Sequence, residues 1–129
     1  MNIEKFEKKE IGARQLEMAL RIFFAEGDLF SVITLAGAAE EIFGQLLLQR
    51  ESQGRSSLRS VLDLLRPGKG SGAAGKGWSA HETDLFIHMD ARQEVLFLLG
   101  RAIDDYRALT GAVSPAMQRF NEEFRGGKG

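Results

Sequence analysis

Hydrophobic residues recur along most of this chain at the spacing of amphipathic helices, and no stretch alternates apolar and polar residues as a strand does. The spacing predicts a first helix over residues 10–25, with an inward stripe of Leu16, Ala19, Leu20, Phe23 and Phe24. Gly27 suits the left-handed conformation that ends a helix, and Asp28 suits the N-cap of the next one. We therefore expect a tight turn between two antiparallel helices.

A second helix is predicted over residues 29–50. Its inward stripe consists of Val32, Leu35, Ala36, Ala39, Ile42, Phe43, Leu46 and Leu47. Gly37, Glu41 and Gly44 fall on the opposite side, and each glycine weakens a helix by about 1 kcal/mol relative to alanine. Two explanations stay open: another backbone approaches this glycine stripe closely, or helix packing elsewhere outweighs the loss.

The rest of the chain also follows helical signals. Ser57 can cap a short helix over residues 58–66, which Pro67 and Gly68 would end. Capping patterns predict a short helix over residues 80–88 and a long one over 91–109, or a single helix with an irregularity near Asp90. Gly111 ends the long helix, and a last helix starts at Ser114 and Pro115 and ends at residue 125.

These elements predict an all-α fold: a compact bundle of five or six helices with antiparallel hairpins. Residues 1–129 are expected to form a single helical domain. Within it, the Gly-rich residues 67–78 are expected to be a flexible loop and residues 126–129 a disordered tail.

Some helices carry more apolar residues than one inward stripe uses. Residues 95–99 are five consecutive apolar residues, so Phe97 points away from the main face of its helix, and Met18 and Ile22 lie off the stripe of the first helix. Exposed apolar patches mark interfaces, so we expect a homodimer. The alternative is a monomer in which the long helix is central and buried all round.

The composition and net charge of the chain exclude several kinds of functional site. The chain has 129 residues, a net charge of −1 and no cysteine, which excludes disulfides, thiolate catalysis and cysteine-based zinc sites. The balanced charge gives no clear nucleic-acid footprint. The N-terminus is charged and no apolar run approaches the roughly 20 residues that span a bilayer, so we expect a cytoplasmic protein without a membrane partner.

Residues 70–76 match the glycine and lysine positions of a phosphate-binding loop. Such a loop also needs a hydroxyl after the lysine, but residue 77 is glycine, and it needs a preceding strand, where this sequence predicts a helix. The match is therefore compositional, and no nucleotide or other cofactor is expected.

One face of the predicted 80–88 helix carries candidate chemistry. His81, Asp84 and His88 would share that face, and imidazoles with a carboxylate are good ligands for zinc or iron. Glu40 could add a ligand only if the bundle brings it near, and Arg92 lies four residues after His88. The alternative is an Asp–His pair on a polar surface. Candidate catalytic residues are thus His88, Arg92 and Glu40, and candidate metal ligands His81, Asp84 and His88.

The chain also carries two adjacent carboxylate pairs, Glu40 with Glu41 and residues 104–105. Adjacent helical side chains diverge by about 100°, so neither pair forms a ready acid–base dyad. Glu40 borders the core stripe, where it could form a salt bridge with Arg101 or Arg107 or lie in a pocket.

The stretch "ARQLEMALRIFFAEGDLFSVITLAGAAEEIFGQL", residues 13–46, resembles a group of small uncharacterised bacterial helical proteins, and its layout is similar to HEPN domains. The resemblance implies an all-helical dimer. HEPN families include ribonucleases whose signature is an arginine followed within a few residues by a histidine. Neither histidine of this chain has such an arginine upstream, and Arg92 follows His88, so the resemblance does not extend to ribonuclease activity.

We therefore predict a non-catalytic helical binding or interaction module that forms a homodimer and could also bind another protein. The alternative is an enzyme, either a HEPN-like nuclease or a metal-dependent hydrolase that uses the His81, Asp84 and His88 face. A third possibility is a small-molecule sensor with a pocket between helices.

Overall fold

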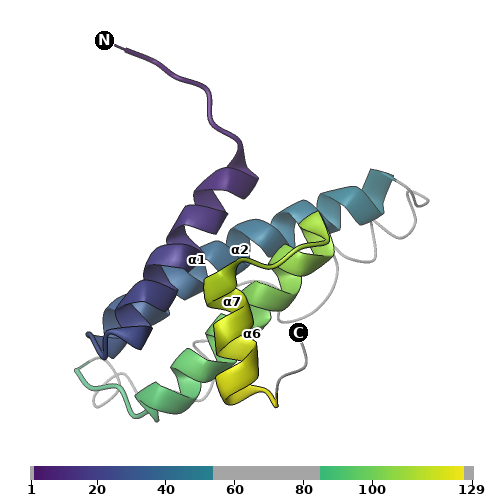
Figure 1. The fold of residues 1–129 in the computed structure, drawn as a ribbon. Helices are drawn as coiled ribbons and strands as arrows, with labels where there is room; N and C mark the ends of the chain where they lie inside the picture. Colours follow the sequence, from purple (N-terminus) through teal and green to yellow (C-terminus); the bar gives the residue numbers. More distant parts are fainter. Residues whose placement is uncertain (1, 54–84, 127–129) are drawn as a thin grey trace. The chain divides into compact units, whose positions relative to one another are not determined.

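The computed structural model describes residues 2–53 and 85–126. Regular structure in these residues is entirely helical: α1 (Lys8–Phe24), α2 (Leu29–Gln53), α6 (Ala91–Thr110) and α7 (Pro115–Phe124) (Figure 1). The all-α prediction is confirmed, and the described residues contain four helices where five or six were expected for the whole chain. The helix predicted over 58–66 and the loop predicted over 67–78 lie outside the described residues.

The chain divides into two compact units. One comprises Met1–Leu48 with Asp90–Gly129 and contains α1, most of α2, α6 and α7. The other comprises Gln49–Met89, of which the end of α2 and residues 85–89 are described. The expectation of a single domain stays a prediction, and the candidate site belongs to the first unit alone.

The prediction of a helix over residues 80–88 is wrong at its described end. Residues 85–90 have no helical structure, so they cannot continue into α6 as one helix either. The Asp90 carboxylate explains the break, because its Oδ1 accepts the Gln93 backbone N–H at 3.1 Å and so caps α6. His88 therefore does not lie on a helical face with His81 and Asp84, and those two residues lie outside the described part of the chain.

The turn between α1 and α2 is a Schellman motif. The Gly27 N–H donates to the Ile22 carbonyl at 2.8 Å, and the Glu26 N–H donates to the Phe23 carbonyl at 3.0 Å. The left-handed residue is Glu26, with φ of 58°, so the assignment of that role to Gly27 is wrong. Gly27 is needed for space instead, because a Cβ there would lie 2.7 Å from Ile22 Cγ2.

Asp28 starts α2 as the sequence predicted. Its Oδ2 accepts the Ser31 backbone N–H at 2.9 Å and the Ser31 hydroxyl at 2.8 Å. These hydrogen bonds from Ser31 lower the pKa of Asp28 because they favour the ionised carboxylate, and the bond from the hydroxyl has the larger effect. The Schellman motif and this cap together fix the reversal, and Figure 1 shows α1 and α2 as the two arms of a hairpin.

The later helix boundaries also follow local chemistry. Gly111 ends α6 in the left-handed region with φ of 78°. The Ser114 hydroxyl oxygen accepts the Met117 backbone N–H at 3.3 Å, and Pro115 occupies the first position of α7. The same hydroxyl donates to the Glu17 carboxylate, which links the start of α7 to α1.

The core lies where these four helices meet. Most of the predicted stripe residues are fully buried, and the buried hydrophobic set is Leu16, Ala19, Leu20, Phe23, Val32, Ala36, Ala39, Phe43, Val95, Leu99, Ala102, Ile103, Met117 and Phe120. Gly12 is buried as well, and a Cβ there would lie 2.6 Å from Phe43 Cε1, so this glycine lets α1 approach α2 closely. By contrast, no described atom lies within 4 Å of a Cβ placed at Gly37 or Gly44, so the close approach suggested there is not seen among the described residues.

Helix α2 is unusually apolar. Among the described residues, Leu29–Ser52 is the one helical segment long and apolar enough to cross a membrane by length and composition, with a mean hydropathy of 1.3. The sequence was expected to contain no apolar segment long enough to span a bilayer, and this helix is an exception by length and composition. The residues Val32, Ala36, Ala39 and Phe43 are fully buried, but only 22% of the window that passes the test is buried. A single helix of this kind is weak evidence for a membrane span. A cytoplasmic location stays a prediction.

Candidate functional site

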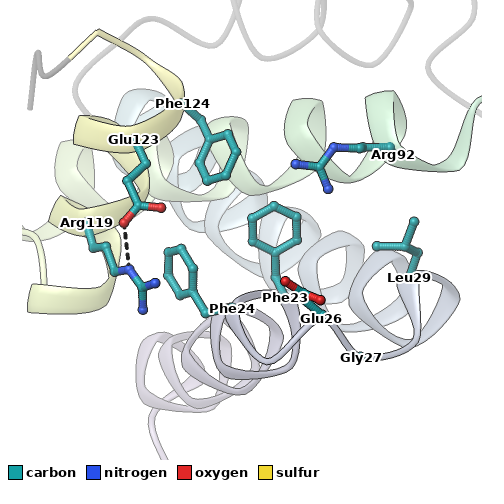
Figure 2. A pocket seen from close by; sticks show the side chains of 9 residues that line it. All are labelled: Phe23, Phe24, Glu26, Gly27, Leu29, Arg92, Arg119, Glu123 and Phe124. Carbon is teal, nitrogen blue, oxygen red and sulfur yellow. Dashed lines mark hydrogen bonds and ion pairs between the residues drawn. The ribbon is translucent and has the colours of Figure 1, made fainter.

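A pocket of about 420 Å³ opens where the α1–α2 turn meets the first turn of α6 and the last turns of α7 (Figure 2). Its volume lies at the lower end of the range of about 300–1,000 Å³ that is typical of small-molecule sites. Aromatic, charged and small residues line it: Phe23, Phe24, Glu26, Gly27, Leu29, Arg92, Arg119, Glu123 and Phe124.

Three phenylalanine rings form the apolar part of the pocket. The Phe23 ring packs edge-on against Phe124, with centroids 5.3 Å apart, and lies 5.6 Å from the Phe24 centroid. Behind them, Phe120 lies 5.2 Å from Phe124 and is itself fully buried. Such edge-on and tilted arrangements are the favoured geometries of aromatic pairs, so the rings support one another as a defined surface.

Arg119 is already engaged within the protein. Its guanidinium lies over the Phe24 ring, 3.8 Å from the centroid, and its Nε donates to Glu123 Oε2 at 2.8 Å (Figure 2). The two side chains are four residues apart on α7, which brings them onto one face of the helix. Their opposite charges therefore neutralise each other at the α7 edge of the pocket.

Arg92 is held by aromatic rings alone among the described residues. Its guanidinium carbon lies 5.5 Å from the Phe23 centroid and 5.8 Å from the Phe124 centroid, within cation–π range. No described carboxylate lies within ion-pair distance of it, and the Glu26 carboxylate likewise has no ion pair or hydrogen bond to a described residue. Both charged groups line the pocket (Figure 2), so among the described residues it offers one available cation and one available anion.

The structure places the predicted site residues in different parts of the molecule. Arg92 is the one that lines the pocket. Glu40 is not among the lining residues; its Oε2 pairs with Arg101 Nη2 at 3.0 Å, which is one of the alternatives left open for this residue. His88 belongs to the second unit, whose position relative to the pocket is not described. Among the described residues, no group of three or more His, Cys, Asp or Glu side chains is arranged to hold a metal ion.

The Glu40–Arg101 pair has an acidic neighbour on α6. Burial raises the pKa of Asp105 above its ordinary value, the negative charge of Glu40 raises it further, and Arg101 opposes both effects. Arg101 also lies over the exposed Phe97 ring, 5.7 Å from its centroid. The cluster thus joins two helices through charge.

Sequence reasoning missed most of the pocket. It assigned Phe23 and Phe24 to the core and singled out neither Arg119 nor Phe124. A usable signal was present in α7, where an arginine is followed four residues later by Glu123, a spacing that places these two side chains on one face of the helix. What the pattern could not reveal is that this side of α7 meets the α1–α2 turn.

Comparisons of the chain with protein-family models, curated proteins and solved structures find no match. The resemblance to HEPN domains and to bacterial helical proteins therefore stays a prediction, as does the alternative of a nuclease or metal-dependent hydrolase.

Proposed function

We propose that this protein is a non-catalytic helical binding module whose ligand occupies the pocket formed by Phe23, Phe124 and Arg92. The observation that carries the proposal is the convergence of three aromatic rings and four charged side chains from α1, the α1–α2 turn, α6 and α7 on one small pocket. Small-molecule sites have this composition: apolar surface for affinity and a few polar groups for orientation.

The chemistry of the lining favours binding over catalysis. Its polar side chains are two arginines and two glutamates, and no serine, threonine, tyrosine or histidine lines it. Nucleophilic catalysis needs an activated hydroxyl, thiol or amine beside a base, and the described lining offers none of these. One of the two glutamates is moreover committed to an arginine, since Glu123 pairs with Arg119.

The test is a thermal-unfolding screen of the full chain with a panel of small carboxylates, amines, amino acids and nucleosides. A ligand present at ten times its Kd stabilises the folded state by about 1.4 kcal/mol, which raises the Tm measurably. We expect at least one compound to do so, and the effect to be lost in Phe124→Ala but kept in Met18→Ala. The matched control is a similarly exposed side chain outside the pocket, since Phe124 is 37% exposed and Met18 43%.

We further propose that the module is a homodimer. Phe97 is 56% exposed on α6, although the opposite face of that helix is filled by Val95, Leu99 and Ala102, so its ring is surplus to the core. A net charge of −1 places no strong repulsion between two copies.

The dimer is tested by light scattering at micromolar concentration. The expected result is a mass of twice 14.3 kDa for the wild-type chain and of one chain for Phe97→Glu, with Phe30→Glu, whose ring is similarly exposed at 60%, remaining a dimer. A monodisperse wild-type monomer under these conditions would refute the dimer and leave the pocket proposal standing.

A further inference from the structure

We infer that the pocket selects a small zwitterion with an apolar side chain, specifically a free α-amino acid of the size of leucine or phenylalanine. This inference rests on the proposed binding function and names its ligand class. It follows from the two available charges and the aromatic rings that line the same pocket.

The charge pattern is the first argument. Of the four charged side chains that line the pocket, Arg119 and Glu123 pair with each other at 2.8 Å. The two that remain are Arg92 and Glu26, which carry opposite charges and have no ion pair with any described residue. A ligand that satisfies both must present a carboxylate to the guanidinium and an ammonium to the carboxylate.

Singly charged ligands fit this pattern less well. A simple carboxylate could pair with Arg92 but would leave Glu26 without a partner and place two negative charges in one small pocket. A simple amine could pair with Glu26 but would leave Arg92 without a partner and place two positive charges in one small pocket. Charge-assisted hydrogen bonds are about twice as strong as neutral ones. A zwitterion forms two of them, whereas a singly charged ligand forms one and also introduces a repulsion, so the zwitterion should bind more tightly.

The apolar surface is the second argument. Arg92 lies against Phe23 and Phe124, so a carboxylate bound to its guanidinium is held beside these two rings. Leu29 adds an aliphatic wall from the first residue of α2. An apolar side chain on the ligand would cover these groups, and each square ångström of apolar surface removed from water contributes about 25 cal/mol.

Size is the third argument. A pocket of about 420 Å³ lies near the lower limit for small-molecule sites, so it suits a compact ligand better than a dinucleotide or a folded peptide segment. In a peptide chain, moreover, the residue that carries the α-carboxylate has an amide in place of the ammonium. The pairing with Glu26 therefore favours the free amino acid.

The test compares three ligands by isothermal titration calorimetry on the full chain: L-phenylalanine, 3-phenylpropionate and phenethylamine. The last two lack the ammonium and the carboxylate respectively. We expect saturable binding of L-phenylalanine with a Kd of about 1 mM or tighter, within the reach of a ligand of this size. Each analogue should bind about tenfold more weakly, the effect of losing one charge-assisted hydrogen bond.

Two variants should separate the charges. Arg92→Gln should weaken the binding of L-phenylalanine and 3-phenylpropionate by about tenfold, and it should not weaken that of phenethylamine, whose ammonium no longer meets a second positive charge. Glu26→Gln should weaken L-phenylalanine and phenethylamine by a similar factor and spare 3-phenylpropionate. Arg14→Gln and Glu122→Gln are the matched controls, because both residues are exposed and neither lines this pocket, and circular dichroism should show all four variants folded.

The outcomes distinguish the ligand assignment from the proposed binding function. Equal affinity for the three ligands, or binding that neither variant changes, would overturn the zwitterion assignment. If L-phenylalanine does not bind while other compounds stabilise the wild type but not Phe124→Ala, the ligand class is wrong and the binding module stands. If no compound in the panel stabilises the protein, the proposed function itself fails.

Discussion

Replacing Gly27 with alanine tests whether the α1–α2 turn sets both the stability of the hairpin and the shape of the pocket. Gly27 lines the pocket and lies between Glu26 and the cap of α2. A Cβ at this position would lie 2.7 Å from Ile22 Cγ2 and 3.2 Å from the Ile22 carbonyl oxygen. The same oxygen accepts the Gly27 N–H at 2.8 Å, so relieving the clash stretches that hydrogen bond.

The expected change in the free energy of unfolding combines two destabilising effects and one stabilising effect. Overpacking of this kind lowers the free energy of unfolding by about 1–3 kcal/mol, and a weakened backbone hydrogen bond lowers it by up to about 1 kcal/mol more. Alanine reduces the conformational entropy of the unfolded chain, which raises the free energy of unfolding by about 0.4–1 kcal/mol. The net expectation for Gly27→Ala is a loss of about 1–3 kcal/mol, or a fall in Tm of roughly 3–5 °C for each kcal/mol.

Urea denaturation of wild type, Gly27→Ala and Gly37→Ala measures this directly. Gly37 is the matched control, because no described atom lies within 4 Å of a Cβ placed there, and alanine in a helix interior should stabilise by up to about 1 kcal/mol. The two variants should thus move the unfolding midpoint in opposite directions. Gly27→Ala as stable as the wild type would refute the steric role assigned to this glycine.

Three further predictions concern the contacts that hold the helices around the pocket. Gly12→Ala should destabilise the protein by about 1–2 kcal/mol in urea denaturation, because its Cβ would lie 2.6 Å from the buried ring of Phe43 and the clash outweighs the gain in helix propensity. Arg125→Lys should lower stability by about 0.5–1 kcal/mol in the same assay, because lysine cannot reproduce the paired hydrogen bonds of 2.9 and 2.8 Å to Asp104; an unchanged midpoint would contradict this. The pKa of Asp28 is lower in the folded state than in the unfolded one, so the ionised carboxylate stabilises the fold. This stabilisation should be complete above about pH 4 and disappear as the pH falls through the lowered pKa. The free energy of unfolding of Asp28→Asn, measured across this range, should lack this pH-dependent contribution.

Local signals predicted the described helices well because each boundary has a nearby cause. Asp28, Asp90 and Ser114 are short-range caps, and Gly111 ends α6 in the conformation expected of it. The core stripes followed from periodicity for the same reason, since burial on one face imposes a repeat on the sequence. The left-handed residue after α1 was misassigned by one position because a Schellman motif admits a non-glycine residue when its backbone hydrogen bonds are formed.

The candidate site could not be predicted to the same extent because it depends on tertiary contacts. Arg92 was singled out, but for its distance along the chain from His88, and its actual neighbours are Phe23 and Phe124, far away in the sequence. The Glu40–Arg101 pair could be named among the alternatives for Glu40 because this residue borders a core stripe that the periodicity predicts. No comparable stripe points to the meeting of the α1–α2 turn with α7.

The measurement that tests the central claim most directly is an ¹⁵N–¹H NMR titration of the full chain with the panel compound that raises its Tm most. We expect the amide signals of Phe24, Gly27, Arg92 and Phe124 to shift together and to saturate with one Kd. We also expect that Ile11 and Met18, on the exposed face of α1 away from the pocket, do not shift. Shifts centred on that face of α1, or none at the four pocket amides, would contradict this prediction.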